Sequence, residues 1–165
     1  QMIELGWSRQ DIVNQIDYTR KSESSGQAYF RADNVLSNTK GILNAIDHYY
    51  RHPAKLPAMT WLSNEIPKAP YDLTAENVNG KLQLKWKTDN AGTRVTYNVY
   101  RSETEDFDVD NAENILATGL REPVFDYSAL IDEKGYYYFV TASDSYHNES
   151  EICYPAFFVH SETIK

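Results

Sequence analysis

The hydrophobic pattern of the second half of the chain has a period of two. In YYYFVTA, from Tyr136 to Ala142, alternate side chains fall on opposite faces, as they do along a β-strand. The stretch KLQLKWK, from Lys81 to Lys87, alternates as strictly, with Leu82, Leu84 and Trp86 on one face and lysine or glutamine on the other. Both stretches predict strands with one buried face.

Shorter strands are predicted around these two. Between Thr96 and Arg101, Tyr97 and Val99 should point inward and Tyr100 outward. The remaining strands are expected at 73–75, 115–118, 124–125 and 151–159, and turns are expected at 89–92 and 145–149. Short strands separated by turns, with a tryptophan (Trp86) in the second strand, predict a β-sandwich.

One corner of this sandwich resembles a known fold. Leu130, a glycine-containing turn from Asp132 to Gly135 and then Tyr136 resemble the corner before the sixth strand of a fibronectin type III-like domain. The resemblance implies that the Tyr136 hydroxyl bonds to the backbone upstream. Such a scaffold carries no chemistry of its own, so function must be argued from a site.

The first part of the chain has a helical period instead. Ser8 to Asp11 has the form of a capping box, and Ile12, Val13 and Ile16 follow on one helical face. We expect a buried strand at 27–30, turns over 33–40 and a second helix from Ile42 to Tyr50. A lone strand between helices indicates a fragment of α/β architecture, since it leaves both strand edges unpaired.

These patterns divide the chain into three segments. Residues 1–65 form a helical segment, 66–70 a proline-rich linker and 71–165 the sandwich. Two prolines three positions apart favour an extended, stiff linker. The predicted fold class is mainly β, an immunoglobulin-like sandwich preceded by an α-helical segment.

Composition narrows the classes of partner. The 165 residues include 16 basic and 24 acidic side chains, for a formal charge of −8, which disfavours nucleic acid and anionic membranes. The single cysteine, Cys153, lies in an apolar run and is expected to be a buried, inert thiol. No apolar run approaches the ~18 residues of a membrane helix.

Nearly the whole chain resembles the C-terminal end of bacterial proteins described as family 10 glycosyl hydrolase-like. The stretches that carry the resemblance are Gly6-Trp7, Gln15-Ile16, GQAYFRADNV (26–35), HPAKLPAMTWL (52–62), YNVYR (97–101) and YYYFVTASDSYHNES (136–150). It implies that residues 1–65 are the end of a (β/α)8 barrel and that the rest of the barrel is a partner outside this chain. The family also implies export, to the periplasm, the cell surface or the medium.

The resemblance implies a candidate substrate site at the barrel rim. Barrel enzymes place their sites at the C-terminal ends of the strands, so Arg31, Asp33 and Asn34 could contact a sugar in the intact enzyme. The alternative is that Asp33 and Asn34 only cap or turn into the next helix. Glycoside hydrolysis requires two carboxylates across one bond, so no catalytic residue is assigned to this chain.

Metal and cofactor chemistry lacks a matching motif. His48 and His52 stand four apart, a spacing that could chelate a metal. They lack a third ligand nearby and fit the end of a helix, where the helix dipole favours them. No metal site and no cofactor is predicted.

Outward-facing aromatics offer a second candidate site. Tyr137, Phe139 and Tyr146 could stack on sugar rings, or they could pack beneath another part of the protein. The sequence therefore predicts a non-catalytic accessory region of a glycoside hydrolase with a packing role. The alternative is a carbohydrate-binding module that retains polysaccharide for the parent enzyme.

Overall fold

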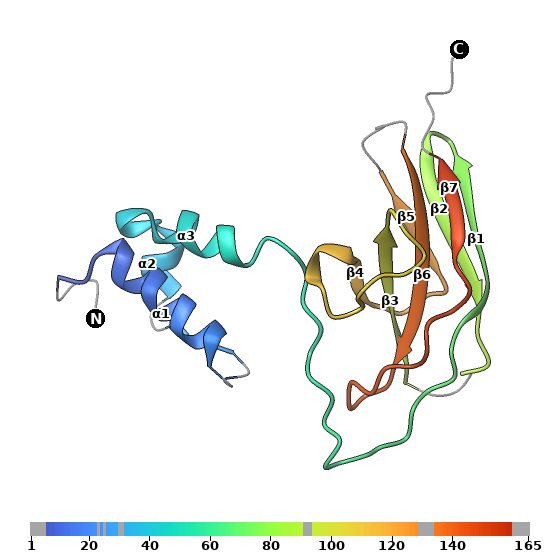
Figure 1. The fold of residues 1–165 in the computed structure, drawn as a ribbon, viewed down its shortest axis with the longest axis horizontal. Helices are drawn as coiled ribbons and strands as arrows, with labels where there is room; N and C mark the ends of the chain where they lie inside the picture. Colours follow the sequence, from blue (N-terminus) through green and yellow to red (C-terminus); the bar gives the residue numbers. More distant parts are fainter. Residues whose placement is uncertain are drawn as a thin grey trace. The chain divides into compact units, whose positions relative to one another are not determined.

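The computed structural model describes residues 6–22, 24, 26–29, 32–90, 94–128 and 134–159. The chain forms two compact units, Gln1–Arg51 and His52–Lys165 (Figure 1). The division falls before the predicted linker at 66–70. Residues 52–70 belong to the second unit.

The first unit begins with the predicted capped helix, α1 (Arg9–Lys21). The Ser8 hydroxyl accepts from the Asp11 amide at 3.3 Å, and the Asp11 carboxylate accepts from the Ser8 amide at 2.8 Å. The capping box is thus confirmed, and it satisfies backbone donors that the first helical turn leaves free. Ile12 and Ile16 are buried, as their spacing predicts.

The rest of this unit differs from the prediction. Helix α2 (Ala32–Leu36) occupies part of the stretch expected to be turns, and a 3₁₀ turn, η1 (Thr39–Gly41), leads into α3 (Ile42–Tyr49). Residues 26–29 form no strand, and Phe30 lies outside the described residues. The physical reason is that the described part of this unit contains no second strand to pair with. Ile42 instead closes a small core against α1.

The second unit is the predicted sandwich, made of two antiparallel sheets (Figure 1). One sheet has the order β1-β2-β5 and the other the order β4-β3-β6-β7. The strands are β1 (Tyr71–Val78), β2 (Lys81–Lys87), β3 (Thr96–Ser102), β4 (Ile115–Leu120), β5 (Val124–Tyr127), β6 (Gly135–Ser143) and β7 (Ala156–Val159). This arrangement is that of a fibronectin type III- or immunoglobulin-like sandwich.

The main core lies between the two sheets and is built by the alternating strands. It contains the inward-facing residues that the sequence predicts: Leu82, Leu84, Trp86, Tyr97, Val99, Tyr136, Tyr138, Val140 and Ala142. The Tyr136 ring is buried and lies 4.4 Å from the Arg101 guanidinium carbon. Leu130 and most of the predicted corner lie outside the described residues, so the corner hydrogen bond remains a prediction.

A second apolar cluster covers the other face of β3 and β6. Tyr100 and Phe139 point away from the main core, as predicted, yet both are buried. The connection between β3 and β4 folds over them, and its Phe107 ring lies 4.2 Å from the ring of Phe139, centroid to centroid. This connection ends in a 3₁₀ turn, η2 (Ala112–Asn114). Part of the outward face of this sheet is therefore covered by a second small core.

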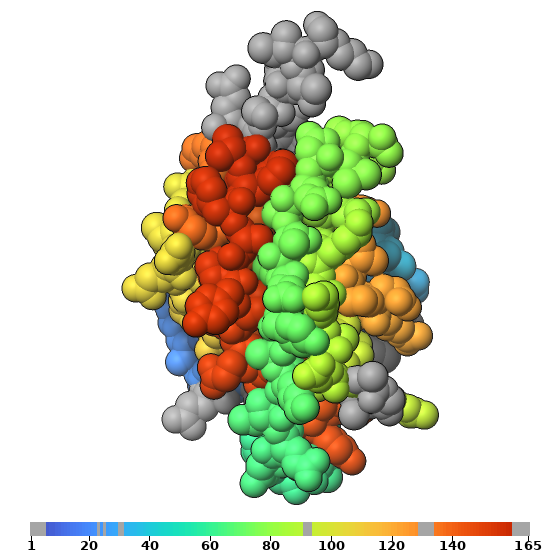
Figure 2. Space-filling model, turned by 90° about the vertical axis from the view of Figure 1, so that its right-hand side faces the viewer, coloured from blue at the N-terminus to red at the C-terminus, as the bar shows by residue number. Residues whose placement is uncertain are grey.

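The last strand is shorter than predicted. Only β7, not the whole of 151–159, is a strand, and it lies beside β1 at the edge of the sandwich (Figure 2). Before it, side chains replace backbone acceptors: the Ser150 hydroxyl accepts from the Ala142 amide at 2.9 Å and the Cys153 thiol accepts from the Val140 amide at 3.1 Å. These contacts interrupt the regular ladder while still satisfying buried donors of β6.

Candidate functional site

A buried carboxylate marks the polar site of the sandwich. Glu149 follows the turn after β6, and one of its oxygens accepts hydrogen bonds from Asn98 (3.0 Å), Thr141 (2.5 Å) and Tyr100. The other oxygen accepts from the Lys55 ammonium at 2.8 Å. Each of these donors comes from β3, β6 or the segment before the sandwich, so Glu149 joins all three.

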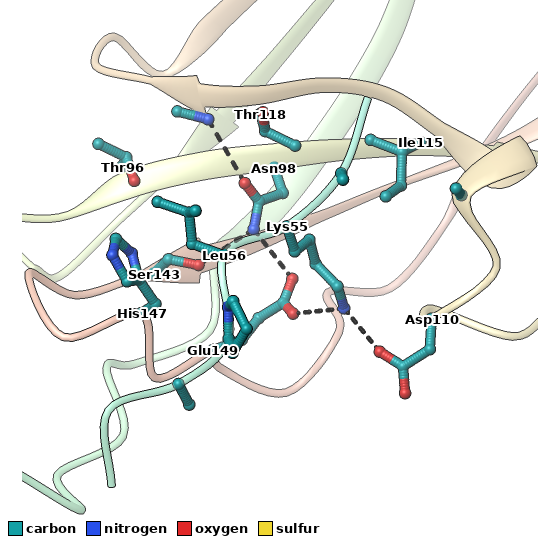
Figure 3. Close-up of a pocket in the computed structure, with 15 residues that line it drawn as sticks. Lys55, Leu56, Thr96, Asn98, Asp110, Ile115, Thr118, Ser143, His147 and Glu149 are labelled. Carbon is teal, nitrogen blue, oxygen red and sulfur yellow. Dashed lines mark hydrogen bonds and ion pairs between the residues drawn. The ribbon is translucent and has the colours of Figure 1, made fainter. Parts of the chain in front are cut away.

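Lys55 completes the site from outside the strands. Its ammonium also lies 3.0 Å from the Asp110 carboxylate and 5.8 Å from the centre of the Tyr100 ring. The side chains of Lys55 and Glu149 are each only 20% exposed, whereas that of Asp110 is 82% exposed. The contact with Glu149 is therefore the less screened of the two ion pairs. Figure 3 shows Lys55 between the two carboxylates.

Residues 52–70, here called the strap, are fixed to the sandwich at further points. The Met59 amide donates to the Tyr146 carbonyl at 2.8 Å, and the Asn148 side-chain amide donates to the Ser63 carbonyl at 3.0 Å. Near the end of the strap, Lys68 donates to and accepts from the side chain of Asn90, at 3.1 and 2.8 Å. These bonds explain why the strap belongs to the second unit and is not a free linker.

The turn that presents Glu149 is built by local hydrogen bonds. The Asp144 carboxylate accepts from the amides of Tyr146 (2.8 Å) and Asn148 (2.9 Å), and His147 takes a left-handed conformation with φ of 64°. An aspartate that accepts from the backbone two residues on is typical of such turns. The predicted polar turn at 145–149 is thus present, and it orients Glu149 back toward β3.

These contacts fix the protonation state of the carboxylate. Burial alone would raise the pKa of Glu149, but the hydrogen bonds from Lys55 and the neutral donors outweigh it and hold this pKa below its usual range. Burial alone would lower the pKa of Lys55, but its hydrogen bonds to Glu149 and Asp110 outweigh burial and raise this pKa. A carboxylate that stays ionised is a poor general acid. The hydrogen bond from Lys55 attaches the strap to this carboxylate.

A cavity of about 640 Å³ opens beside this ion pair (Figure 3). The strap forms one wall through Leu56 and Pro57, while Thr96 and Ile115 come from β3 and β4. Ser143 and His147, at either end of the turn after β6, lie on the same side of Leu56 as Thr96 (Figure 3). The cavity is therefore bounded by the strap, by one sheet and by the turn that carries Glu149.

The residues predicted for the barrel rim are not brought together with this site. Arg31 lies outside the described residues, and Asp33 and Asn34 lie in the five-residue helix α2 of the first unit. The Asp33 carbonyl accepts from the Ser37 amide at 2.9 Å and from its hydroxyl at 2.6 Å. Their role in sugar binding remains a prediction.

The three aromatic residues predicted to bind sugar differ in their exposure to solvent. Phe139 is 3% exposed beneath Phe107, so its ring faces are not open to a sugar, whereas Tyr146 is 40% exposed. Tyr137 is half-buried and packs on Phe157, with ring centroids 4.8 Å apart. Phe139 thus lies within the second apolar cluster, and glycan binding by Tyr137 and Tyr146 stays a prediction.

His48 and Cys153 each make a hydrogen bond within the described residues. The His48 ring nitrogen Nδ1 accepts a hydrogen bond from the Arg51 guanidinium at 2.9 Å. Among the described residues, no cluster of three or more His, Cys, Asp or Glu could hold a metal. Burial raises the pKa of Cys153 to about 11, as expected for the inert thiol predicted. No helix in the described ranges is long and apolar enough to cross a membrane.

Sequence reasoning missed the central residues of the site. Lys55 stands between two prolines in HPAKLP, and Glu149 stands in a polar turn, so neither belongs to a periodic pattern. The one available signal was charge: Lys55 is the only cation between His52 and Ser63 in an otherwise apolar stretch. A lone cation in such a stretch requires a partner when it is buried.

No family profile matches the chain. The chain is 32% identical, over 155 residues, to glycosyl hydrolase YngK of Bacillus subtilis (strain 168), covering 88% of this chain and 29% of that protein. The chain therefore spans less than a third of the length of this curated relative. It is related in sequence to a glycosyl hydrolase.

Solved structures similar to the sandwich share little sequence with it. A Fn3-like protein from Clostridium thermocellum is 20% identical, covers 60% of this chain and 98% of its own, and has a TM-score of 0.46. Pectate lyase Pel3 from Pectobacterium carotovorum is 18% identical, covers 58% of this chain and 28% of its own, and has a TM-score of 0.42.

Proposed function

We propose that the chain is a non-catalytic accessory region of a glycoside hydrolase, and that its sandwich packs beside the catalytic part of that enzyme. The observation that carries the proposal is the similarity to YngK, which covers 88% of this chain and only 29% of the relative. A match of that extent reaches beyond either unit alone. In this proposal, both units are part of the same accessory region.

The finer form of the proposal concerns the helical unit. In it, residues 1–65 are the end of a (β/α)8 barrel of the family 10-like kind, and the remainder of the barrel is the partner of this chain. The apolar residues of α1 and α3 that remain exposed, such as Leu43, would then pack on that barrel. Export of the parent enzyme belongs to the same proposal.

The strap supports a structural role for the sandwich. An ordinary flexible linker would let the sandwich move freely, whereas here residues 55–68 are hydrogen-bonded to the sandwich at both ends and in the middle. The sandwich and strap would therefore act as one rigid body next to the catalytic part. The most buried carboxylate of the site is used in this attachment.

The experiment is a pair of assays on the whole chain. We expect no hydrolysis of a panel of nitrophenyl glycosides and soluble polysaccharides, and no retention on insoluble cellulose, chitin or xylan. Hydrolysis by the purified chain would overturn the accessory role. Retention on one polysaccharide would favour the second candidate, a carbohydrate-binding module, for which the exposed ring of Tyr146 is the supporting observation.

A variant pair separates packing from binding. Phe139→Ala removes a ring buried in the second apolar cluster and should cost about 3–5 kcal/mol of stability. The matched control is Tyr154→Ala, because Tyr154 is 94% exposed and its removal should change stability by less than ~0.5 kcal/mol. A Phe139 variant that melts like the wild type but loses glycan retention would contradict the packing role.

A further inference from the structure

We propose that the cavity beside the strap is a binding site for a small, neutral, hydroxyl-rich molecule, of the size of one or two sugar rings. This ligand site goes beyond the packing role and does not depend on it. The evidence is the size of the cavity, the unused hydrogen-bonding groups that line it and the balance of charge around it.

The size of the cavity sets the scale of the ligand. Its volume is about 640 Å³, within the range of ~300–1,000 Å³ found for small-molecule sites. It is bounded by a short stretch of the strap and by β3 and β4, so it is a pocket and not a groove along the sheet. A short, soluble ligand fits this shape better than a long polysaccharide strand.

Three polar side chains in the wall have hydrogen-bonding capacity to spare. The Ser143 hydroxyl accepts from Asn98 at 3.0 Å, but among the described residues nothing accepts its own proton, although Ser143 is 8% exposed. The Thr96 hydroxyl and the His147 ring, which line the same cavity, make no hydrogen bond within the described ranges. Hydroxyls and an imidazole can each donate and accept, which suits a ligand that bears hydroxyl groups.

The charged groups at the cavity are already committed to one another. Lys55 is bound by Glu149 at 2.8 Å and by Asp110 at 3.0 Å. One cation between two carboxylates leaves a local excess of negative charge, which repels an anion. A cation would have to compete with the ammonium already in place. A neutral ligand meets neither obstacle.

The remaining wall is apolar and supplies contact area. Leu56 and Pro57 of the strap and Ile115 of β4 all line the cavity. The C–H faces of a sugar ring could pack between these side chains while its hydroxyls reach Ser143 and Thr96. Without an open aromatic ring in the wall, the affinity should be weak, with Kd on the order of millimolar.

The test is a titration of the whole ¹⁵N-labelled chain followed by ¹H–¹⁵N spectra. The probes are glucose, xylose, N-acetylglucosamine, cellobiose and maltose, each to 50 mM, with glucuronate as the anionic comparison. We expect saturable shifts for at least one neutral probe, centred on the amides of Thr96, Gly119 and Ser143, and weaker binding of glucuronate. The absence of saturable shifts for every neutral probe overturns the proposal.

Variants locate the site. Thr96→Val and Ser143→Ala each remove one hydrogen bond to the ligand and should weaken binding by about 3- to 10-fold. Thr96→Val is the safer of the two because its hydroxyl has no partner in the described protein. Thr74→Val, on an exposed position of the other sheet, is the control and should leave Kd unchanged. Binding that survives both cavity variants would place the ligand elsewhere and overturn the proposal.

The result can be separated from that for the proposed function. Hydrolysis of glycosides by the chain would overturn the accessory role without bearing on these shifts. Retention on insoluble polysaccharide, with no shift at the cavity, would support a carbohydrate-binding module and still overturn this site.

Discussion

Removing the carboxylate of Glu149 should destabilise the sandwich more than any exposed ion pair does. Glu149→Ala leaves three neutral donors without their acceptor and leaves the Lys55 ammonium with Asp110 alone, in a site where the side chains of Lys55 and Glu149 are only 20% exposed. Breaking a buried, hydrogen-bonded pair from one side costs about 3–5 kcal/mol. Some water can reach this site, so we expect about 3 kcal/mol.

The opposite truncation should cost less. Lys55→Met keeps most of the apolar stem and leaves Glu149 with its neutral donors, so the expected loss is about 1–2 kcal/mol. The two residues share one interaction, so their losses should not add. The loss of stability in the double variant should be smaller, by at least ~1 kcal/mol, than the sum of the losses in the two single variants. Lys134→Met is the control, since it removes an exposed pair with Glu103 worth at most ~1 kcal/mol.

Urea denaturation measures these stabilities, and hydrogen exchange shows where they are lost. The Met59 amide, which donates to the Tyr146 carbonyl of the sandwich, should exchange faster in both Glu149→Ala and Lys55→Met, because the strap opens locally before the sandwich unfolds. The control should leave that amide protected. If Glu149→Ala loses less than ~1 kcal/mol and Met59 stays protected, the strap is not held by this ion pair and the reasoning is wrong.

Three other parts of the second unit can be tested in the same way: the titration of Glu149, the burial of Cys153 and the end of the strap at Asn90. Because folding lowers the pKa of Glu149, the unfolded chain takes up the proton first as the pH falls. The ionised Glu149 should therefore stabilise the fold fully above pH 4.5, and this stabilisation should be lost as the pH falls further. Urea denaturation of Glu149→Gln at several pH values should lack this pH-dependent loss. The Cys153 thiol, with a pKa raised to about 11, should not react with a disulfide reagent at pH 8 until denaturant is added; prompt reaction in the native state would contradict its burial. Asn90→Ala should cost about 1–3 kcal/mol and expose the Lys68 amide to exchange, since both hydrogen bonds between them are lost; unchanged protection would show that the strap end is held by other contacts.

The sandwich could be predicted because its information is local. Along β2 and β6 the alternation of residue types indicates which side chains face the core. The buried positions of Leu84 and Tyr138 therefore follow from this alternation alone. The capping box of α1 is equally local, since it spans four residues. Patterns of this kind can be found in one sequence without knowing what lies across from them.

The rest could not be predicted because it depends on contacts between distant segments. Alternation placed Tyr100 and Phe139 on the outer face, but it gave no hint that Phe107, in an irregular connection, would cover them. The Lys55–Glu149 contact joins residues 94 positions apart. The strand expected at 27–30 failed for the same kind of reason: a strand requires a partner, and its apolar run carried no information on one.

The strap also determines at which residue the sandwich domain begins, because it belongs to the same compact unit. A cassette cut at Tyr71, where the first strand starts, would omit Lys55 and so leave the Glu149 carboxylate without its counter-ion. It would also leave the side chains of Asn90 and Asn148 without the strap carbonyls that they bind. A fusion of this domain to another enzyme should therefore begin at His52, so that the strap is included in the transferred domain.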